Sequence, residues 1–122
     1  SPRWSEAADC IVAVVDGDSL RVRTECLPPP PELTLVRLFG IDTPELHGQC
    51  QDERLRAIDA KFYVETAIRA ARVITISQVG IEKFGRPLLE VFVDHVNLAD
   101  RLVVEGLARR YDGRGKRGSW CP

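Results

Sequence analysis

The sequence predicts a single α+β domain, mainly β, in which five short strands form a Greek-key barrel packed with two helices. Short runs of β-branched residues alternate with polar ones, and clusters of Gly, Asp and Pro separate these runs. One long segment instead carries apolar residues at helical spacing. A chain of 122 residues has room for one core, so we expect one domain over residues 1–122, with its core at about 10–112 and a basic C-terminal extension at 113–122.

Three strands are expected in the first part of the chain. Residues 10–23, CIVAVVDGDSLRVR, predict a β-hairpin because β-branched residues lead into an Asp-Gly turn and alternation resumes after it. Residues 26–33, CLPPPPEL, predict a rigid connector, since proline fixes φ and lacks an N–H group. Residues 33–41, LTLVRLFGI, predict a third strand that contains Arg37.

A long helix is expected from about Gln51 to Arg72. Apolar residues recur in this segment at steps of three and four, which places them on one face of a helix. The residues of this expected stripe are Ala57, Ala60, Val64, Ala67 and Ala71, widened by Leu55, Ile58 and Phe62.

Two more strands and a second helix complete the expected order. Residues 73–79 and 88–94 predict strands, and the Gly-Arg-Pro turn at 82–87 separates them. Asn97 is a suitable N-cap for a helix over residues 98–105, and Gly106 follows it as a stop signal. This order of elements is that of an OB-fold: three strands, one helix, two strands and a second helix.

Four cysteines leave two interpretations open. Their spacing contains no C-x-x-C pair, which disfavours a zinc site. An even number permits two disulfides in an exported protein, and the expected pairs are Cys10–Cys26, on either side of the hairpin turn, and Cys50–Cys121. The alternative is that all four are free thiols. The disulfide interpretation favours a secreted or periplasmic location over the cytoplasm.

Composition narrows the class of protein. Hydrophobic residues make up 44% and charged residues 29% of the chain, which is ordinary for a globular protein. The longest apolar run, Cys10 to Val15, is far shorter than the ~20 residues of a membrane helix. We expect a monomer with no membrane partner. Because the chain lacks methionine, we also expect it to be processed or excised from a longer product.

The charge is unevenly distributed along the chain. A net charge of −1 gives no overall positive field to attract nucleic acid. Residues 109–117, RRYDGRGKR, are nevertheless strongly basic. Such a run is either a solvated tail or a patch that contacts phosphate groups.

Acidic residues cluster at two expected turns. Asp16 and Asp18 lie at the tip of the first hairpin, and Asp42 and Glu45 follow the third strand in the stretch GIDTPEL. Carboxylates are hard ligands for Ca²⁺ or Mg²⁺, and a carboxylate can also act as general base toward water. Aspartate is also a common turn former, so this signal is weak when taken alone.

Two arginines extend this pattern. Arg37 lies within the third strand and Arg86 in the turn before the fifth. A guanidinium group binds phosphate through two parallel hydrogen bonds and stabilises charge in the transition state. Taken alone, Arg37 would be a solvent-facing strand residue and Arg86 an exposed turn residue. Carboxylates and arginines together form the inventory that a phosphodiester hydrolase needs.

Four blocks of the sequence, VVDGDSLRV, VRLFGIDTPE, EKFGRPLLEVFV and VNLADRLVVEGLARRY, resemble the staphylococcal nuclease (thermonuclease) family in order and spacing. The resemblance extends from Ile11 to Tyr111 and implies an OB-type five-stranded barrel. Position by position, it implies catalytic roles for Arg37, Glu45 and Arg86, and metal binding by Asp18, Asp42 and the main-chain carbonyl of Thr43.

The expected substrate-binding residues match the family pattern less closely than the catalytic ones. Lys83 and Tyr111 match positions that line the family's nucleotide site, although Tyr111 is equally compatible with packing in the core. Phe84 stands where the family often has a tyrosine, so a hydroxyl near the terminal phosphate is missing. The family's third helix is expected to be missing or replaced by a short extension. Trp120 in this part of the chain is expected to cover the barrel or, alternatively, to stack on a base.

The resemblance implies a metal-dependent nuclease that hydrolyses DNA and/or RNA with little sequence specificity, acting as an endo- and exonuclease. Its cofactor is expected to be Ca²⁺, with Mg²⁺ or Mn²⁺ as substitutes, and its products to carry 3′-phosphate ends. The alternative is a non-catalytic OB-fold module that binds nucleic acid or protein. A purely structural domain would leave the acids and arginines unexplained.

Overall fold

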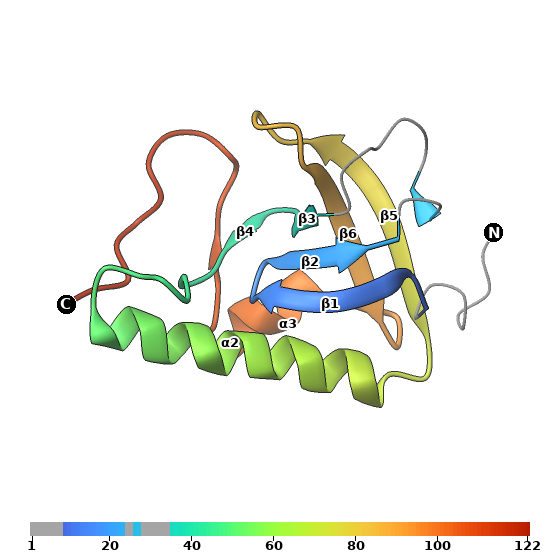
Figure 1. Ribbon diagram of the computed structural model, residues 1–122, viewed down its shortest axis with the longest axis horizontal. Coiled ribbons are helices and arrows are strands. Elements are labelled where there is room, and N and C mark those ends of the chain that lie inside the picture. The colour runs from blue at the N-terminus through green and yellow to red at the C-terminus, as the bar shows by residue number, and fades with distance from the viewer. Residues whose placement is uncertain (1–8, 24–25, 28–34) are drawn as a thin grey trace.

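Two helices and two β-sheets form the described part of the computed structural model, which covers residues 9–23, 26–27 and 35–122 (Figure 1). The class is α+β. The elements are β1 (Ile11–Asp16), β2 (Ser19–Val22), β3 (Leu35–Leu38), β4 (Ile41–Asp42), α2 (Gln51–Ala70), β5 (Ile74–Ile81), β6 (Pro87–Val93), β7 (Val96–Asn97), α3 (Leu98–Val104) and β8 (Arg109–Arg110).

The larger sheet is mixed. Its strands follow the order β1-β2-β3-β6-β5, with β7 paired to β6, and only the β3–β6 pair is parallel. β4 and β8 form a separate antiparallel pair. Within the described residues β1 pairs only with β2 and β5 only with β6, so no closed barrel is detected. The closed five-stranded OB barrel therefore stays a prediction.

Most expected elements are confirmed, and the third strand differs in one respect. It is split into β3 and β4 because Gly40 has a positive φ of 87°, which turns the chain before Ile41. β4 then pairs with β8, a two-residue strand too short to leave a pattern in the sequence. Most of the expected proline connector, residues 28–33, lies outside the described residues.

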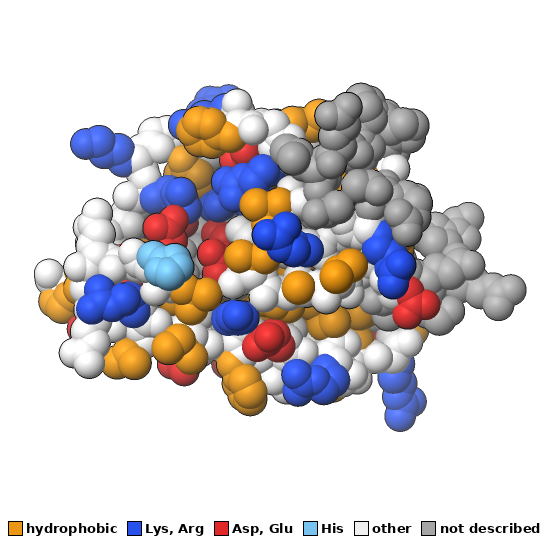
Figure 2. All heavy atoms as spheres, viewed as in Figure 1, with side chains coloured by type: hydrophobic (Ala, Val, Ile, Leu, Met, Phe, Trp, Pro, Cys, Tyr) orange, Lys and Arg blue, Asp and Glu red, His pale blue; other side chains and the backbone are white. Residues whose placement is uncertain are grey.

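Helix α2 buries most of the expected stripe of small apolar residues but not the larger residues expected beside it. Ala57, Ala60, Val64 and Ala67 are buried, whereas Leu55, Ile58 and Phe62 are 53–64% exposed. Ala71, expected in the stripe, is the C-cap beyond the end of the helix and is only partly buried. Our expectation for these three larger residues was wrong, because the helix rests on the β1–β2 hairpin through its narrow alanine face (Figure 1). Figure 2 shows hydrophobic side chains among charged ones along this edge of the molecule.

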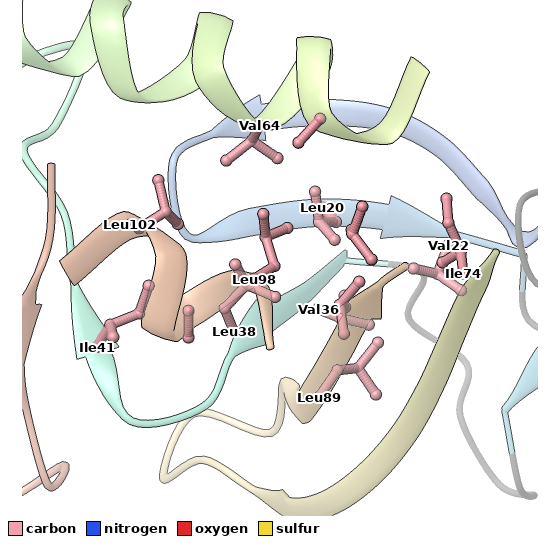
Figure 3. Close-up of a cluster of buried hydrophobic side chains, with 14 of the residues drawn as sticks. Leu20, Val22, Val36, Leu38, Ile41, Val64, Ile74, Leu89, Leu98 and Leu102 are labelled. Carbon is pink, nitrogen blue, oxygen red and sulfur yellow. The ribbon is translucent and has the colours of Figure 1, made fainter. Parts of the chain in front are cut away.

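The core lies between α2, α3 and the larger sheet (Figure 3). Leu20 of β2, Leu38 of β3 and Ile41 of β4 are at most 1% exposed. Each lies within two residues of an expected site residue, so burial of these apolar side chains fixes the strand ends that carry the site. Burying a leucine side chain contributes about 1.5–3 kcal/mol to stability.

Two disulfide bonds join the chain, Cys10–Cys26 and Cys50–Cys121, and both were expected pairings. The second bond brings the C-terminal segment, residues 112–122, to the N-terminal end of α2, where the C-terminus also lies (Figure 1). Cys50 is also the N-cap of α2. Among the described helices, none combines the length and apolarity that a membrane span requires.

Candidate active site

Three buried side chains from separate elements meet at the end of β3. The Nη2 atom of Arg37 lies 3.2 Å from Oδ2 of Asp18 and 3.8 Å from Oδ1 of Asp42. It also donates a hydrogen bond of 3.1 Å to the carbonyl of Ile41. The main-chain N–H of Thr43 donates to the same oxygen of Asp18, at 3.2 Å. The structure thus brings together Asp18, Arg37, Asp42 and Thr43, all less than 10% exposed.

A two-residue turn delivers Asp18 to this cluster. Asp16 pairs with Ser19 across the hairpin, which leaves Gly17 and Asp18 as the loop. Gly17 has an ordinary φ, so its requirement is spatial: a Cβ atom there would lie 2.8 Å from Cβ of Ala60 and 3.1 Å from Thr43. Only glycine lets the turn approach α2 closely enough to bury Asp18.

Arg86 is held in position by Glu82. Its Nη2 atom pairs with Oε2 of Glu82 at 3.0 Å, and Oε1 of Glu82 accepts from the backbone N–H groups of Phe84 and Arg86. The hydrogen bond from Arg86 lowers the pKa of Glu82 and raises that of Arg86 itself. Glu82, which the sequence did not identify, therefore orients one of the two expected phosphate-binding arginines.

A cavity of about 360 Å³ connects the expected substrate-binding residues. Its walls include Arg37, Arg86, Lys83 and Tyr111. Lys83 lies over the ring of Phe84, which is 75% exposed. Tyr111 is half-buried at the cavity wall rather than in the core, and its hydroxyl donates to the carbonyl of Gly115 at 2.8 Å. Cations and rings at one opening suit a nucleotide chain.

Glu45 lies on a loop that Glu53 holds. The carboxylate of Glu53, which is 7% exposed at the start of α2, accepts the backbone N–H groups of Glu45 and Gln49 at 3.1 and 3.0 Å. The side chain of Glu45 is itself 56% exposed. This carboxylate is thus accessible to water and anchored through its backbone, as a general base requires. The sequence analysis did not single out Glu53.

The C-terminal segment enters the site. Nη1 of Arg117 lies 2.9 Å from Oδ1 of Asp42 and 3.6 Å from Oε1 of Glu45. The indole N–H of Trp120 donates to Oδ2 of Asp42 at 3.1 Å. Burial lowers the pKa of Arg117, but the hydrogen bond to Asp42 and the nearby carboxylate charges outweigh it, so the net shift is upward. Trp120 therefore binds a site carboxylate, which neither of the two expectations for this residue included.

The oxygen atoms at this site fit a hard divalent cation. Asp18 and Asp42 are both buried carboxylates, and the buried Oγ1 of neighbouring Thr43 has no hydrogen-bond partner among the described residues. Although both oxygens of Asp42 accept hydrogen bonds, each carboxylate oxygen has a second lone pair. Ca²⁺ takes several oxygen ligands of this type.

A second group of potential ligands lies nearby. Within the described ranges, Cys50, Glu53 and Cys121 place ligand atoms close together. The two sulfur atoms form a disulfide bond, so neither is a thiolate that binds metal. The cation expected from the sequence is therefore better matched by the Asp18–Asp42 site.

Asp16 lies beside this site, and its side-chain pKa is raised. Burial and the charge of Asp18 raise the pKa of Asp16 to about 7, from an ordinary value of 3.8. Between these two pH values the folded protein keeps a proton that the unfolded chain releases. Stability therefore falls as the pH rises from about 4 to 7.

Replacing Asp16 by asparagine is expected to stabilise the metal-free protein above pH 7. Asparagine keeps the Oδ1 acceptor for the backbone N–H of Asp18 but carries no charge. Thermal unfolding in EDTA should show a difference in Tm between Asp16→Asn and the wild type that grows from pH 4 to pH 8. A difference that is constant with pH would contradict this assignment.

Comparison with known proteins places the chain in a family. Residues 35–119 match the family model described as staphylococcal nuclease homologue. The match includes every expected site residue except Asp18 and three of the cysteines, Cys10, Cys26 and Cys121. The chain is also 27% identical, over 124 residues, to the uncharacterized protein MJ1439 of Methanocaldococcus jannaschii. That alignment covers 83% of this chain and 58% of the relative, so the chain spans little more than half of the relative's length. The chain belongs to the staphylococcal nuclease homologue family.

Proposed function

We propose that this protein is a metal-dependent nuclease that hydrolyses phosphodiester bonds of DNA and/or RNA with little sequence specificity. The observation that carries the proposal is the placement of Arg37. Its guanidinium lies against the carboxylates of Asp18 and Asp42 and also lines the cavity shared with Arg86. Family membership supports the same reaction class.

The proposed roles follow from position and exposure. Arg37 and Arg86 bind phosphoryl oxygens and stabilise the charge that develops on them in the transition state. Glu45, the exposed carboxylate, takes the proton from the attacking water. Asp18, Asp42 and the main chain of Thr43 would hold Ca²⁺, or Mg²⁺ or Mn²⁺ in its place, and the bound cation would polarise the phosphoryl group. Cleavage leaves 3′-phosphate ends.

The residues of the cavity walls support the proposal of low sequence specificity. The positive charge of Lys83 can attract the phosphate backbone of the nucleic acid, and any base can stack on the rings of Phe84 and Tyr111. Stacking and phosphate contacts carry little sequence information. The missing hydroxyl at Phe84 is expected to weaken preference for a terminal phosphate, which favours cleavage within the strand over cleavage at its ends.

The cellular setting is part of the proposal. Two disulfide bonds persist best in an oxidising compartment, which favours a secreted or periplasmic location. The proposal also includes a monomeric OB-type barrel as the scaffold. The order of its strands, β1-β2-β3-β6-β5, is compatible with such a barrel.

Cleavage of heat-denatured DNA and of RNA in Ca²⁺, Mg²⁺ or Mn²⁺ tests the function. We expect turnover that EDTA abolishes and that Glu45→Gln lowers by about 10²–10⁴-fold. Asp59→Asn changes an exposed carboxylate of α2 that has no expected role in the site; it is the control and should retain activity. Phosphate released from the products by a 3′-phosphatase would identify the cleaved bond. Binding without turnover in every ion would instead support a non-catalytic module.

A further inference from the structure

We propose that Arg117 is a third phosphate-binding arginine of this site, positioned by the C-terminal segment, residues 112–122. The inference rests on the proposed function and names a substrate-binding residue that the sequence motifs do not include. It follows from the contacts of Arg117, the charges around the cavity and the way the segment is anchored.

Arg117 uses only part of its hydrogen-bonding capacity. Both of its ion pairs, to Asp42 and to Glu45, involve the same nitrogen, Nη1. Among the described residues no partner is found for its other guanidinium nitrogens. Its side chain is 39% exposed, and a guanidinium has five donors. Several donors therefore remain for a ligand oxygen.

Those donors lie between the two parts of the site. Arg117 lines the 360 Å³ cavity that holds Arg37 and Arg86, and also a second cavity of about 260 Å³ lined by Asp42 and Glu45. Arg117 therefore lies between the cavity of the expected general base and the cavity of the expected phosphate-binding arginines. A phosphodiester that binds across the two cavities would therefore lie within reach of this guanidinium.

Charge around the larger cavity favours an anion. Four basic side chains line it, Arg37, Lys83, Arg86 and Arg117, against two acidic ones, Glu82 and Asp112. Glu82 is already paired with Arg86. Arg37 and Arg117 are paired with carboxylates behind this wall, Asp18, Asp42 and Glu45, so the surplus of positive charge belongs to the residues that face the cavity. Focused positive charge raises the local concentration of an anionic substrate.

The segment that carries Arg117 is firmly anchored. Trp120 is 9% exposed, and the guanidinium of Arg109 stacks 3.8 Å from its ring. Arg109 also donates to the carbonyl of Ser119 at 2.8 Å. One residue further, Cys121 is bonded to Cys50 at the start of α2. A side chain held this way loses little entropy when it binds phosphate, which distinguishes it from a basic residue on a solvated tail.

The same geometry allows an opposite role, in which the positive charge of Arg117 competes with a cation for Asp42. The two roles predict opposite effects of removing the side chain. Loss of a phosphate contact weakens nucleic-acid binding. Loss of a competing charge strengthens cation binding and leaves nucleic-acid binding unchanged or tighter.

Equilibrium binding separates these outcomes. The protein is prepared as Glu45→Gln, which is expected to cleave about 10²–10⁴-fold more slowly. Fluorescence anisotropy is measured with a fluorescein-labelled oligothymidylate in Ca²⁺, within a time over which the oligonucleotide stays intact. We expect Arg117→Ala to raise Kd about tenfold or more, and Arg117→Lys to raise it less, because lysine keeps the charge without the planar fork. Arg114→Ala is the matched control from the same segment and is expected to leave Kd within about twofold.

The salt dependence of Kd provides a second measurement. Removing one phosphate contact on a single strand lowers the slope of log Kd against log salt concentration by about 0.7. We expect this change for Arg117→Ala and not for Arg114→Ala. Thermal unfolding of each variant shows whether the fold is retained.

Each outcome decides one question. An unchanged or lower Kd for folded Arg117→Ala would overturn the inference, whatever its affinity for Ca²⁺, and would leave the nuclease proposal in place. Oligonucleotide binding that depends on Arg117, in a protein that cleaves nothing, would support the inference and overturn the catalytic proposal. Absence of any binding by the Glu45→Gln protein would overturn both.

Discussion

Replacing Arg37 by alanine is expected to lower kcat/KM for single-stranded DNA by about 10²–10³-fold, the loss typical of one charge-stabilising donor. The same change should reduce the free energy of unfolding by about 3–5 kcal/mol, because it leaves the buried carboxylates of Asp18 and Asp42 without their shared guanidinium. Initial-rate kinetics and urea unfolding measure the two effects separately.

A matched control for this prediction is Arg110→Ala. Arg110 pairs with Asp100 at 2.7 Å, but both side chains are more than half exposed. Exposed pairs contribute only about 0–1 kcal/mol, so stability and activity should change little. Arg37→Lys should recover part of the stability and little of the activity, since lysine lacks the fork that binds phosphate. Equal stability losses for Arg37→Ala and Arg110→Ala would contradict our account of the buried cluster.

Removing the Cys50–Cys121 disulfide, as Cys50→Ser/Cys121→Ser, is expected to lower the free energy of unfolding by about 4 kcal/mol. The bond closes a loop between positions 71 residues apart, and stabilisation grows with loop length in the chain-entropy account. The loss should also weaken oligonucleotide binding, because this bond anchors the segment that carries Arg117 and Trp120. Urea unfolding and anisotropy measure the two effects.

The other disulfide is the natural comparison. Cys10–Cys26 joins positions 16 residues apart, and its removal should cost about 3 kcal/mol. We expect Cys10→Ser/Cys26→Ser to leave oligonucleotide affinity nearly unchanged below its melting temperature. If both double variants weaken binding equally, the effect arises from general destabilisation and the specific role of the C-terminal segment is wrong.

How far the sequence predicts this molecule depends on the range of the contacts involved. Asp18 and Arg37 were identified because each sits in a local pattern, a turn and a strand. Arg117 and Trp120 were missed as site residues because their partner, Asp42, lies 75 and 78 residues earlier in the chain. One signal for them was present: a Cys50–Cys121 bond necessarily brings its neighbour Trp120 near the loop that follows Asp42.

The errors on α2 have a different cause. Periodicity shows which residues share a helix face but not how wide the contact with the neighbouring sheet is. Because small alanines make this contact, Leu55, Ile58 and Phe62 stay at the surface although their spacing is helical. Closure of the barrel is likewise decided by pairings between distant strands, which no local pattern reports.

The tight approach of the first hairpin to α2 has an evolutionary consequence. A methyl group at position 17 would collide with Cβ of Ala60 and press on Thr43, so these positions are not free to vary one at a time. A larger residue at 17 requires a smaller one at 60, or a shift of the helix that would move Asp18 away from Arg37. Among relatives that keep the activity, substitutions at positions 17 and 60 should therefore occur together.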